Sequence, residues 1–139
     1  MVHALEEIRR TLVPEGVLID LRPLADRWPV EVTSGRLCHP IGRLTDLPAG
    51  LADDEAAENA VLEAVRQGWF RRELKQTFPF FYYWETPEEM RAYLREKWVD
   101  FVRLEEAEYS SAESTWAATG ADGRVRVKLK MLLTRWRKR

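Results

Sequence analysis

Two charged residues, Asp20 and Arg22, stand at the end of a short apolar stretch that predicts a β-strand over residues 17–22. In an open sheet, the crevice beyond the carboxyl ends of the strands is where ligands usually bind. Asp20 and Arg22 are therefore candidate ligand-binding residues. The alternative is structural, because the same pair suits a local ion pair or a solvated strand end.

A run of aromatic residues over 78–84 forms a second candidate site, with Tyr82, Tyr83 and Trp84 as its polar members. Aromatic rings line pockets for flat or apolar ligands, and the Tyr hydroxyl and Trp N–H groups orient them. Strands of this composition also serve packing. In that interpretation alternate residues fill the core and the others cover a subunit interface.

The last strand places cations on one face, namely Arg124, Arg126, Lys128 and Lys130. Residues 124–139 hold eight of the 22 Lys and Arg and no acid, so 14 basic and 23 acidic residues precede them, a formal −9 facing +8. Such a row suits phosphates, with Trp136 stacking on a base. Alternatively, acids elsewhere neutralise the row, Glu73 among them, and the charges discourage edge-to-edge aggregation. Nucleic acid is the least favoured partner.

The pair Cys38-His39 suggests a nucleophile or a metal ligand, but no third ligand has a suitable spacing, and the other histidine is His3 near the terminus. We therefore predict a structural role for it. A single cysteine excludes an internal disulfide and a Cys-pair zinc site. The sequence assigns neither a catalytic nor a metal-ligating residue.

The period of the apolar residues predicts an α+β fold in a single domain, 1–139. It has a mixed sheet with a parallel strand-helix-strand unit, a small hairpin, a long antiparallel C-terminal strand and about four helices. Strand 17–22 is nearly continuously apolar, so we expect it inside the sheet. The elements expected in order are helix 3–13, strand 17–22, a hairpin through 30–38, helix 52–67, strand 69–83, a helix opened by Thr86-Pro87, helix 105–119 and strand 124–137.

Composition is that of a globular protein, with 45% hydrophobic and 32% charged residues. No apolar run approaches the roughly 20 residues that span a bilayer, and the start lacks the pattern of a signal peptide. A soluble cytoplasmic protein, without a membrane partner, is therefore expected.

The stretch ALEEIRRTLVPEGVLIDLRP, residues 4–23, resembles the helix, L-x-P-x-G turn and fifth strand of class I S-adenosylmethionine-dependent methyltransferases. Catalytic members typically read LxPGG, and Glu15 stands where the first of those glycines would be. The predicted order of elements is similar to the C-terminal half of that family. In the family, the cofactor sits on a Gly-rich turn after the first strand, and none of the seven glycines here forms a GxG.

The resemblance therefore implies no cofactor on the isolated chain, and S-adenosylmethionine only where a partner supplies the other half. We expect a non-catalytic, methyltransferase-like binding or dimerisation domain. One alternative is part of a split or truncated methyltransferase that needs a partner chain, and another is a nucleic-acid binding module. If strand 17–22 lacks a neighbour in the sheet, the hairpin 30–44, a second copy or a separate chain must cover it.

Overall fold

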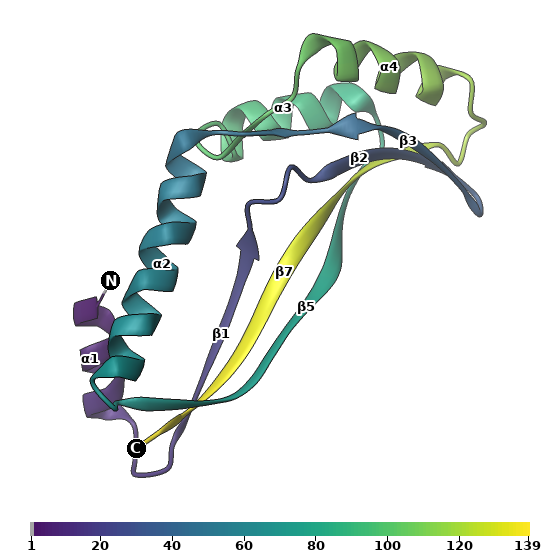
Figure 1. The fold of residues 1–139 in the computed structure, drawn as a ribbon. Coiled ribbons are helices and arrows are strands. Elements are labelled where there is room, and N and C mark those ends of the chain that lie inside the picture. The colour runs from purple at the N-terminus through teal and green to yellow at the C-terminus, as the bar shows by residue number, and fades with distance from the viewer. Residues whose placement is uncertain (1) are drawn as a thin grey trace. The chain divides into compact units, whose positions relative to one another are not determined.

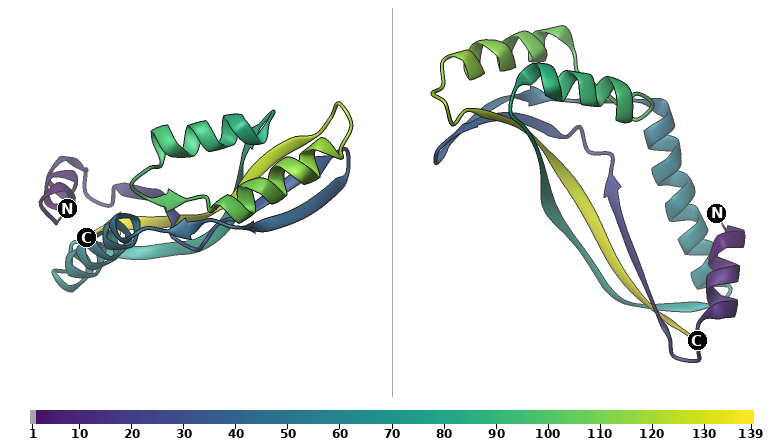
Figure 2. Two further views of the ribbon diagram at one scale, coloured as in Figure 1. Left: turned by 90° about the horizontal axis from the view of Figure 1, so that it is seen from above. Right: turned by 180° about the vertical axis from the view of Figure 1, so that it is seen from behind.

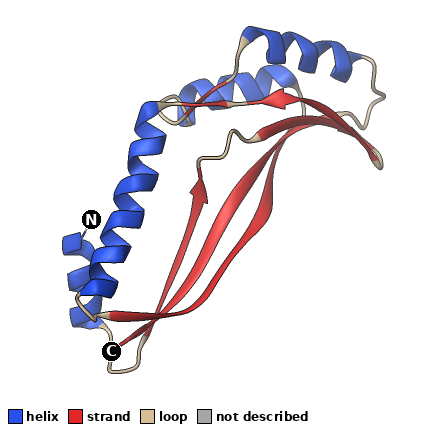
Figure 3. Cartoon of the chain, in the orientation of Figure 1, coloured by secondary structure: helices blue, strands red, loops and turns tan. Residues whose placement is uncertain are grey.

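The computed structural model describes residues 2–139, which form four helices and seven strands (Figure 1), and Figure 3 distinguishes the two types by colour. The α+β class predicted from the sequence is confirmed. The elements are α1 (Val2–Thr11), β1 (Val17–Leu24), β2 (Pro29–Ser34), β3 (Leu37–Arg43), β4 (Thr45–Asp46), α2 (Pro48–Arg66), β5 (Phe70–Trp84), α3 (Pro87–Lys97), β6 (Val102–Arg103), α4 (Glu106–Ala117) and β7 (Arg124–Lys138).

The described chain divides into two compact units. Unit 1 comprises the residues up to Leu24 together with Ala52–Phe78 and Met131–Arg139. Unit 2 comprises Ala25–Leu51 and Pro79–Lys130. The two long strands β5 and β7 belong to both units, and each unit is described by itself below.

The sheet of unit 1 contains β1, the second half of β7 and the first half of β5. Strand β7 lies between the other two and runs antiparallel to both (Figure 1 and Figure 2). Strand β1 is therefore an edge strand, and the expectation that it lies inside the sheet is wrong. The strand-helix-strand unit is present, but β7 separates its two strands.

The core of unit 1 lies on one face of this sheet. Helices α1 and α2 run side by side there, as both views in Figure 2 agree. Helix α1 packs its apolar side chains on the core cluster. Helix α2 begins at Pro48, four residues before the expected start, because proline suits the first turn of a helix. The core cluster consists of Ala64, Phe70 and Trp136, with Leu5, Ile8, Leu12, Leu18, Val61 and Trp69 packed against it.

Unit 2 is built on the predicted hairpin. Strands β2 and β3 pair antiparallel up to Ser34 and Leu37, and Gly35 in the turn has a φ of +58°, which glycine adopts without strain. Strand β2 also pairs antiparallel with β7. The core is formed by Val30, Val32, Val125 and Val127, all fully buried.

Two helices complete unit 2. Helix α3 opens as predicted, because the Thr86 side chain accepts a hydrogen bond from the Glu89 N–H and Pro87 holds the first position. Helix α4 packs on the hairpin. A short ladder between β4 and β6 was not expected, since two-residue strands are too short to show a period.

The buried face of β7 changes along the strand. Val125, Val127 and Leu129 are buried in unit 2, whereas Leu132, Thr134 and Trp136 are buried in unit 1. The alternation therefore shifts by one residue between Leu129 and Leu132, where two successive leucines, Leu132 and Leu133, interrupt the period of two in the sequence. This shift places the polar Thr134 in the core of unit 1.

Candidate functional site

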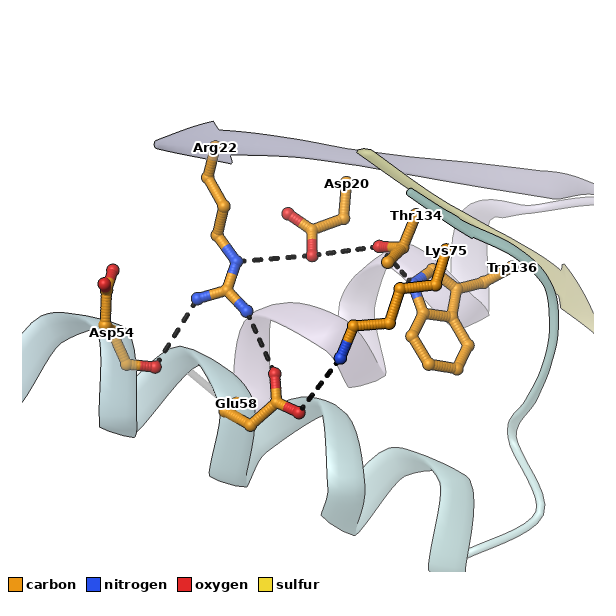
Figure 4. Close-up of polar contacts among 7 residues, drawn as sticks. All are labelled: Asp20, Arg22, Asp54, Glu58, Lys75, Thr134 and Trp136. Atoms are coloured by element: carbon orange, nitrogen blue, oxygen red, sulfur yellow. Dashed lines mark hydrogen bonds and ion pairs between the residues drawn. The ribbon is translucent and has the colours of Figure 1, made fainter. Parts of the chain in front are cut away.

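Asp20 and Arg22 lie on the face of β1 that is turned toward α2 (Figure 4). Both side chains are largely buried, at 23% and 16% exposed. They alternate with residues on the opposite face, as strand geometry requires. The sequence therefore located two polar groups inside unit 1, close to where a helix covers the sheet.

The network around Arg22 links β1 to α2. The Arg22 Nε lies 3.5 Å from the Asp20 carboxylate, and a second guanidinium nitrogen lies 3.3 Å from Glu58. The remaining nitrogen donates to the carbonyl of Asp54 at 3.5 Å. The Lys75 ammonium on β5 reaches the other Glu58 oxygen at 3.8 Å.

A buried hydrogen-bond chain leads from the same carboxylate into the core. The Thr134 hydroxyl donates to Asp20 Oδ2 at 3.2 Å, and the indole Nε1 of Trp136 donates to the Thr134 oxygen at 2.9 Å. The two carboxylates and two cations of the network balance each other. This arrangement favours a structural ion pair over a ligand site for Asp20 and Arg22, since each charge already faces an opposite charge.

The aromatic run divides between the two faces of β5. Tyr82 and Trp84 point into a cluster with Tyr93 and Trp98, with ring centroids 5.3–6.2 Å apart. The hydroxyl groups of Tyr82 and Tyr93 lie 3.0 Å apart. This hydrogen bond, together with burial, raises the pKa of Tyr93 above its ordinary 10.0. The cluster has the character of packing.

Tyr83 lies on the other face of β5, beside the basic row. Its hydroxyl accepts a hydrogen bond from Arg126 at 3.0 Å, and the Arg126 guanidinium lies 4.3 Å from the Phe81 ring centroid. Arg126 also pairs with Glu31. Burial by itself lowers the pKa of Arg126, but the bonds to Tyr83 and Glu31 outweigh it and raise the pKa.

The other cations of the row are largely neutralised. Arg124 pairs with Glu85 at 3.0 Å and Lys130 with Asp26 at 3.4 Å. Among the described residues, Lys128 is the member of the row that forms no ion pair. Glu73, expected from the sequence to neutralise the basic strand, pairs with Arg135 and Arg137 further along β7.

The uncovered face of β1 is the third candidate surface. Val17, Ile19 and Leu21 alternate with the buried side chains and are 36%, 53% and 56% exposed. Among the described strands, β1 pairs with β7 alone. Along residues 17–21, one edge of its backbone therefore has no neighbouring strand, and an apolar surface lies beside it.

A cavity in unit 2, of about 380 Å³, was not expected from the sequence. Its apolar wall includes Leu94 and Val102. The arginines at its rim are engaged, since Arg91 pairs with Glu106 and Arg103 with Glu105. These ion pairs leave the cavity without a free charge to orient a ligand.

Comparison with protein-family models, curated proteins and solved structures gives no match. In the part of the chain that the structure describes, no helix is long and apolar enough to cross a membrane. The same residues contain no group of three or more His, Cys, Asp or Glu side chains able to hold a metal, and Cys38 is exposed. Function is therefore argued from the surfaces described above.

Sequence reasoning missed most partners of the candidate residues. Thr134 contacts Asp20 and Glu58 contacts Arg22, and no motif around Thr134 or Glu58 in the sequence indicates these contacts. The one available signal was the break in alternation near Leu132, which turns Thr134 inward. Tyr93 lies on helix α3, which was predicted from its Thr86-Pro87 start, so its contact with Tyr82 had no sequence signal.

Proposed function

We propose that the chain is a non-catalytic, methyltransferase-like domain that binds another polypeptide, or a copy of itself, along β1. The observation that carries the proposal is the combination of a free backbone edge with exposed Val17, Ile19 and Leu21 on one strand. An exposed apolar edge strand is a template for pairing with another chain. We place this activity in the cytoplasm.

Two features support binding over catalysis. Asp20 and Arg22 are engaged by Thr134, Glu58 and the Asp54 carbonyl, so they offer no free acid, base or anion-binding group. The aromatic cluster of unit 2 uses its rings and hydroxyl groups for internal contacts. The lack of a GxG turn in the sequence agrees with this view.

The alternative is a split methyltransferase, in which a separate chain supplies the cofactor half. Strands β1 and β5 run in the same direction with β7 antiparallel between them (Figure 1), so an added strand beside β1 would extend one continuous sheet. In this case only the complex with a GxG-bearing chain binds S-adenosylmethionine.

Titration calorimetry with S-adenosylmethionine distinguishes the binding domain proposed above from a split methyltransferase. The leading proposal predicts no micromolar binding by the purified chain, and such binding by the chain alone would reject it.

Amide hydrogen exchange tests the free edge directly. In dilute solution, the amides of Val17, Ile19 and Leu21 should exchange as fast as unbonded amides, whereas slow exchange would show that the edge is already covered.

A nucleic-acid role has less support. Three of the four cations in the basic row pair with Glu85, Glu31 and Asp26, which leaves Lys128 as the main unpaired charge. Affinity for phosphate backbones grows with the number of free cations. We therefore keep this role as a minor alternative.

A further inference from the structure

In β1, the backbone N–H and C=O groups of successive residues point alternately to the two edges of the strand. The Gly16 carbonyl accepts a hydrogen bond from the Lys138 N–H at 2.9 Å. Four residues further along each strand, the Thr134 side-chain hydroxyl donates to the Asp20 carboxylate, so residues 20 and 134 stand opposite each other in the same register as residues 16 and 138. Even-numbered residues therefore direct their backbone groups at β7, and residues 17, 19 and 21 direct theirs at the free edge.

The same three residues carry the exposed apolar side chains. We infer that the occupant of this edge is a second copy of the chain, paired antiparallel along β1 with Ile19 of each copy opposite Ile19 of the other. The inference rests on the function proposed above and commits it to one partner. A two-fold axis at Ile19 makes the contact isologous, so it closes as a dimer and does not extend into a fibre.

The register follows from the ends of the strand. With Ile19 opposite Ile19, Val17 lies opposite Leu21 of the second copy, and every outward N–H of these residues meets a carbonyl. A shift of the axis toward the N-terminus places Leu21 opposite Glu15, whose φ of +60° lies outside the strand. A shift the other way places Val17 opposite Pro23, which has no N–H to donate.

Charge also favours self-pairing at this edge. No charged side chain occupies the exposed face of β1 between Val17 and Leu21. The charges of the strand, on Asp20 and Arg22, face α2 and are paired there. In the proposed register Asp20 lies opposite Leu18 of the second copy, so two like charges do not meet.

The opposite edge of the unit 1 sheet is less suited to pairing with a second copy. Strand β5 also hydrogen-bonds with β7 alone among the described strands. Its first half carries Arg71, Arg72, Glu73 and Lys75, and charged side chains along an edge disfavour pairing with a copy of itself. The contrast between the two edges identifies β1 as the one suited to a second copy.

Site-directed cross-linking tests the register, in a chain whose Cys38 is first replaced by serine. Opposed residues in a hydrogen-bonded antiparallel pair have Cα atoms about 5.5 Å apart, within the disulfide range of about 4.4–6.8 Å. Ile19→Cys should cross-link with itself under mild oxidation. Val17→Cys alone should not, because the two copies of residue 17 lie roughly 14 Å apart, whereas a mixture of Val17→Cys and Leu21→Cys should.

Leu74→Cys on β5 is the matched control, since Leu74 is apolar and 41% exposed on the other edge, and it should not cross-link. Equal cross-linking at all these positions, or none at Ile19→Cys, would overturn the inference. Ile19→Arg should weaken the dimer about tenfold or more, because it sets two cations opposite each other. Circular dichroism confirms that each variant is folded.

Amide exchange as a function of protein concentration distinguishes failure of this inference from failure of the proposed function. If the protection of the Val17, Ile19 and Leu21 amides increases as the chain concentration rises from micromolar to millimolar, the result supports both this inference and the proposed function. Fast exchange at every concentration overturns the second copy and leaves the edge free for another polypeptide. Protection that is independent of concentration overturns both, because the chain then covers the edge itself.

Discussion

Replacing Thr134 with valine removes one hydroxyl from the core of unit 1 and keeps the shape of the side chain. Thr134 is 2% exposed, accepts a hydrogen bond from Trp136 Nε1 at 2.9 Å and donates one to Asp20 Oδ2 at 3.2 Å. In the variant, the indole N–H of the buried Trp136 has no acceptor. The Asp20 carboxylate also loses a donor.

The expected loss is dominated by the indole. A buried donor left without a partner costs about 1–3 kcal/mol. Asp20 is partly open to water, so the loss of its hydrogen bond costs about 1 kcal/mol, and the added methyl group returns somewhat less than about 1 kcal/mol. We therefore expect Thr134→Val to lower the free energy of unfolding by about 1–3 kcal/mol.

Urea unfolding followed by circular dichroism measures this difference, with an unchanged slope as the sign that the folded state is preserved. Thr33→Val on β2 is the matched control, because Thr33 is half-buried and makes no side-chain hydrogen bond with a described residue. In a Trp136→Phe background the cost of Thr134→Val should fall well below about 1 kcal/mol, because the lost hydrogen bond to Asp20 and the added methyl group then nearly cancel. Equal losses at Thr134 and Thr33, or no change in that background, would refute the reasoning.

Three further predictions concern charged and phenolic groups. Arg137 lowers the pKa of Glu73 below its ordinary 4.5. The stabilisation from this pair is therefore complete above pH 4.5 and is lost as the pH falls through the lowered pKa. Glu73→Gln should make the free energy of unfolding depend less on pH in this acidic range. Tyr82→Phe should lower the pKa of Tyr93 toward 10.0, measured by tyrosinate absorbance, and an unchanged midpoint would contradict the hydrogen bond's role. Lys128→Glu should leave retention on a phosphate-bearing column nearly unchanged at physiological salt, whereas a large salt-dependent loss would favour nucleic-acid binding.

Local patterns predicted the elements of this fold well. The Thr86-Pro87 start of α3, the hairpin around Gly35 and the alternation of Val125 and Val127 each depend on a few neighbouring residues. Each of these signals lies within a short stretch of sequence and needs no knowledge of distant contacts. They were sufficient for the α+β class and for most element bounds.

The position of β1 was not predictable in the same way. Its continuous apolar composition is typical of a strand covered on both faces, but strand order depends on where β7 inserts, and that contact joins residues more than 100 positions apart. The alternation of burial in β1 is a consequence of this order. Exposure of Ile19 and Leu21 therefore had no local signal.

The candidate sites show the same division. Asp20 and Arg22 were located correctly on one strand, and the open question was whether they face a ligand or each other. The answer depends on Glu58, a residue of α2 that the sequence pattern marks only as part of a polar helix face. Pairing between distant charges is set by tertiary packing, which no single sequence motif encodes here.

Amide hydrogen exchange at β1 tests the central claim most directly, because the claim concerns which backbone groups of one strand are free. The account predicts rapid exchange of the Val17, Ile19 and Leu21 amides in dilute solution and slower exchange in the assembled state, while the even-numbered amides bonded to β7 stay protected throughout. Strong protection of those three amides in the dilute, monomeric chain would contradict it.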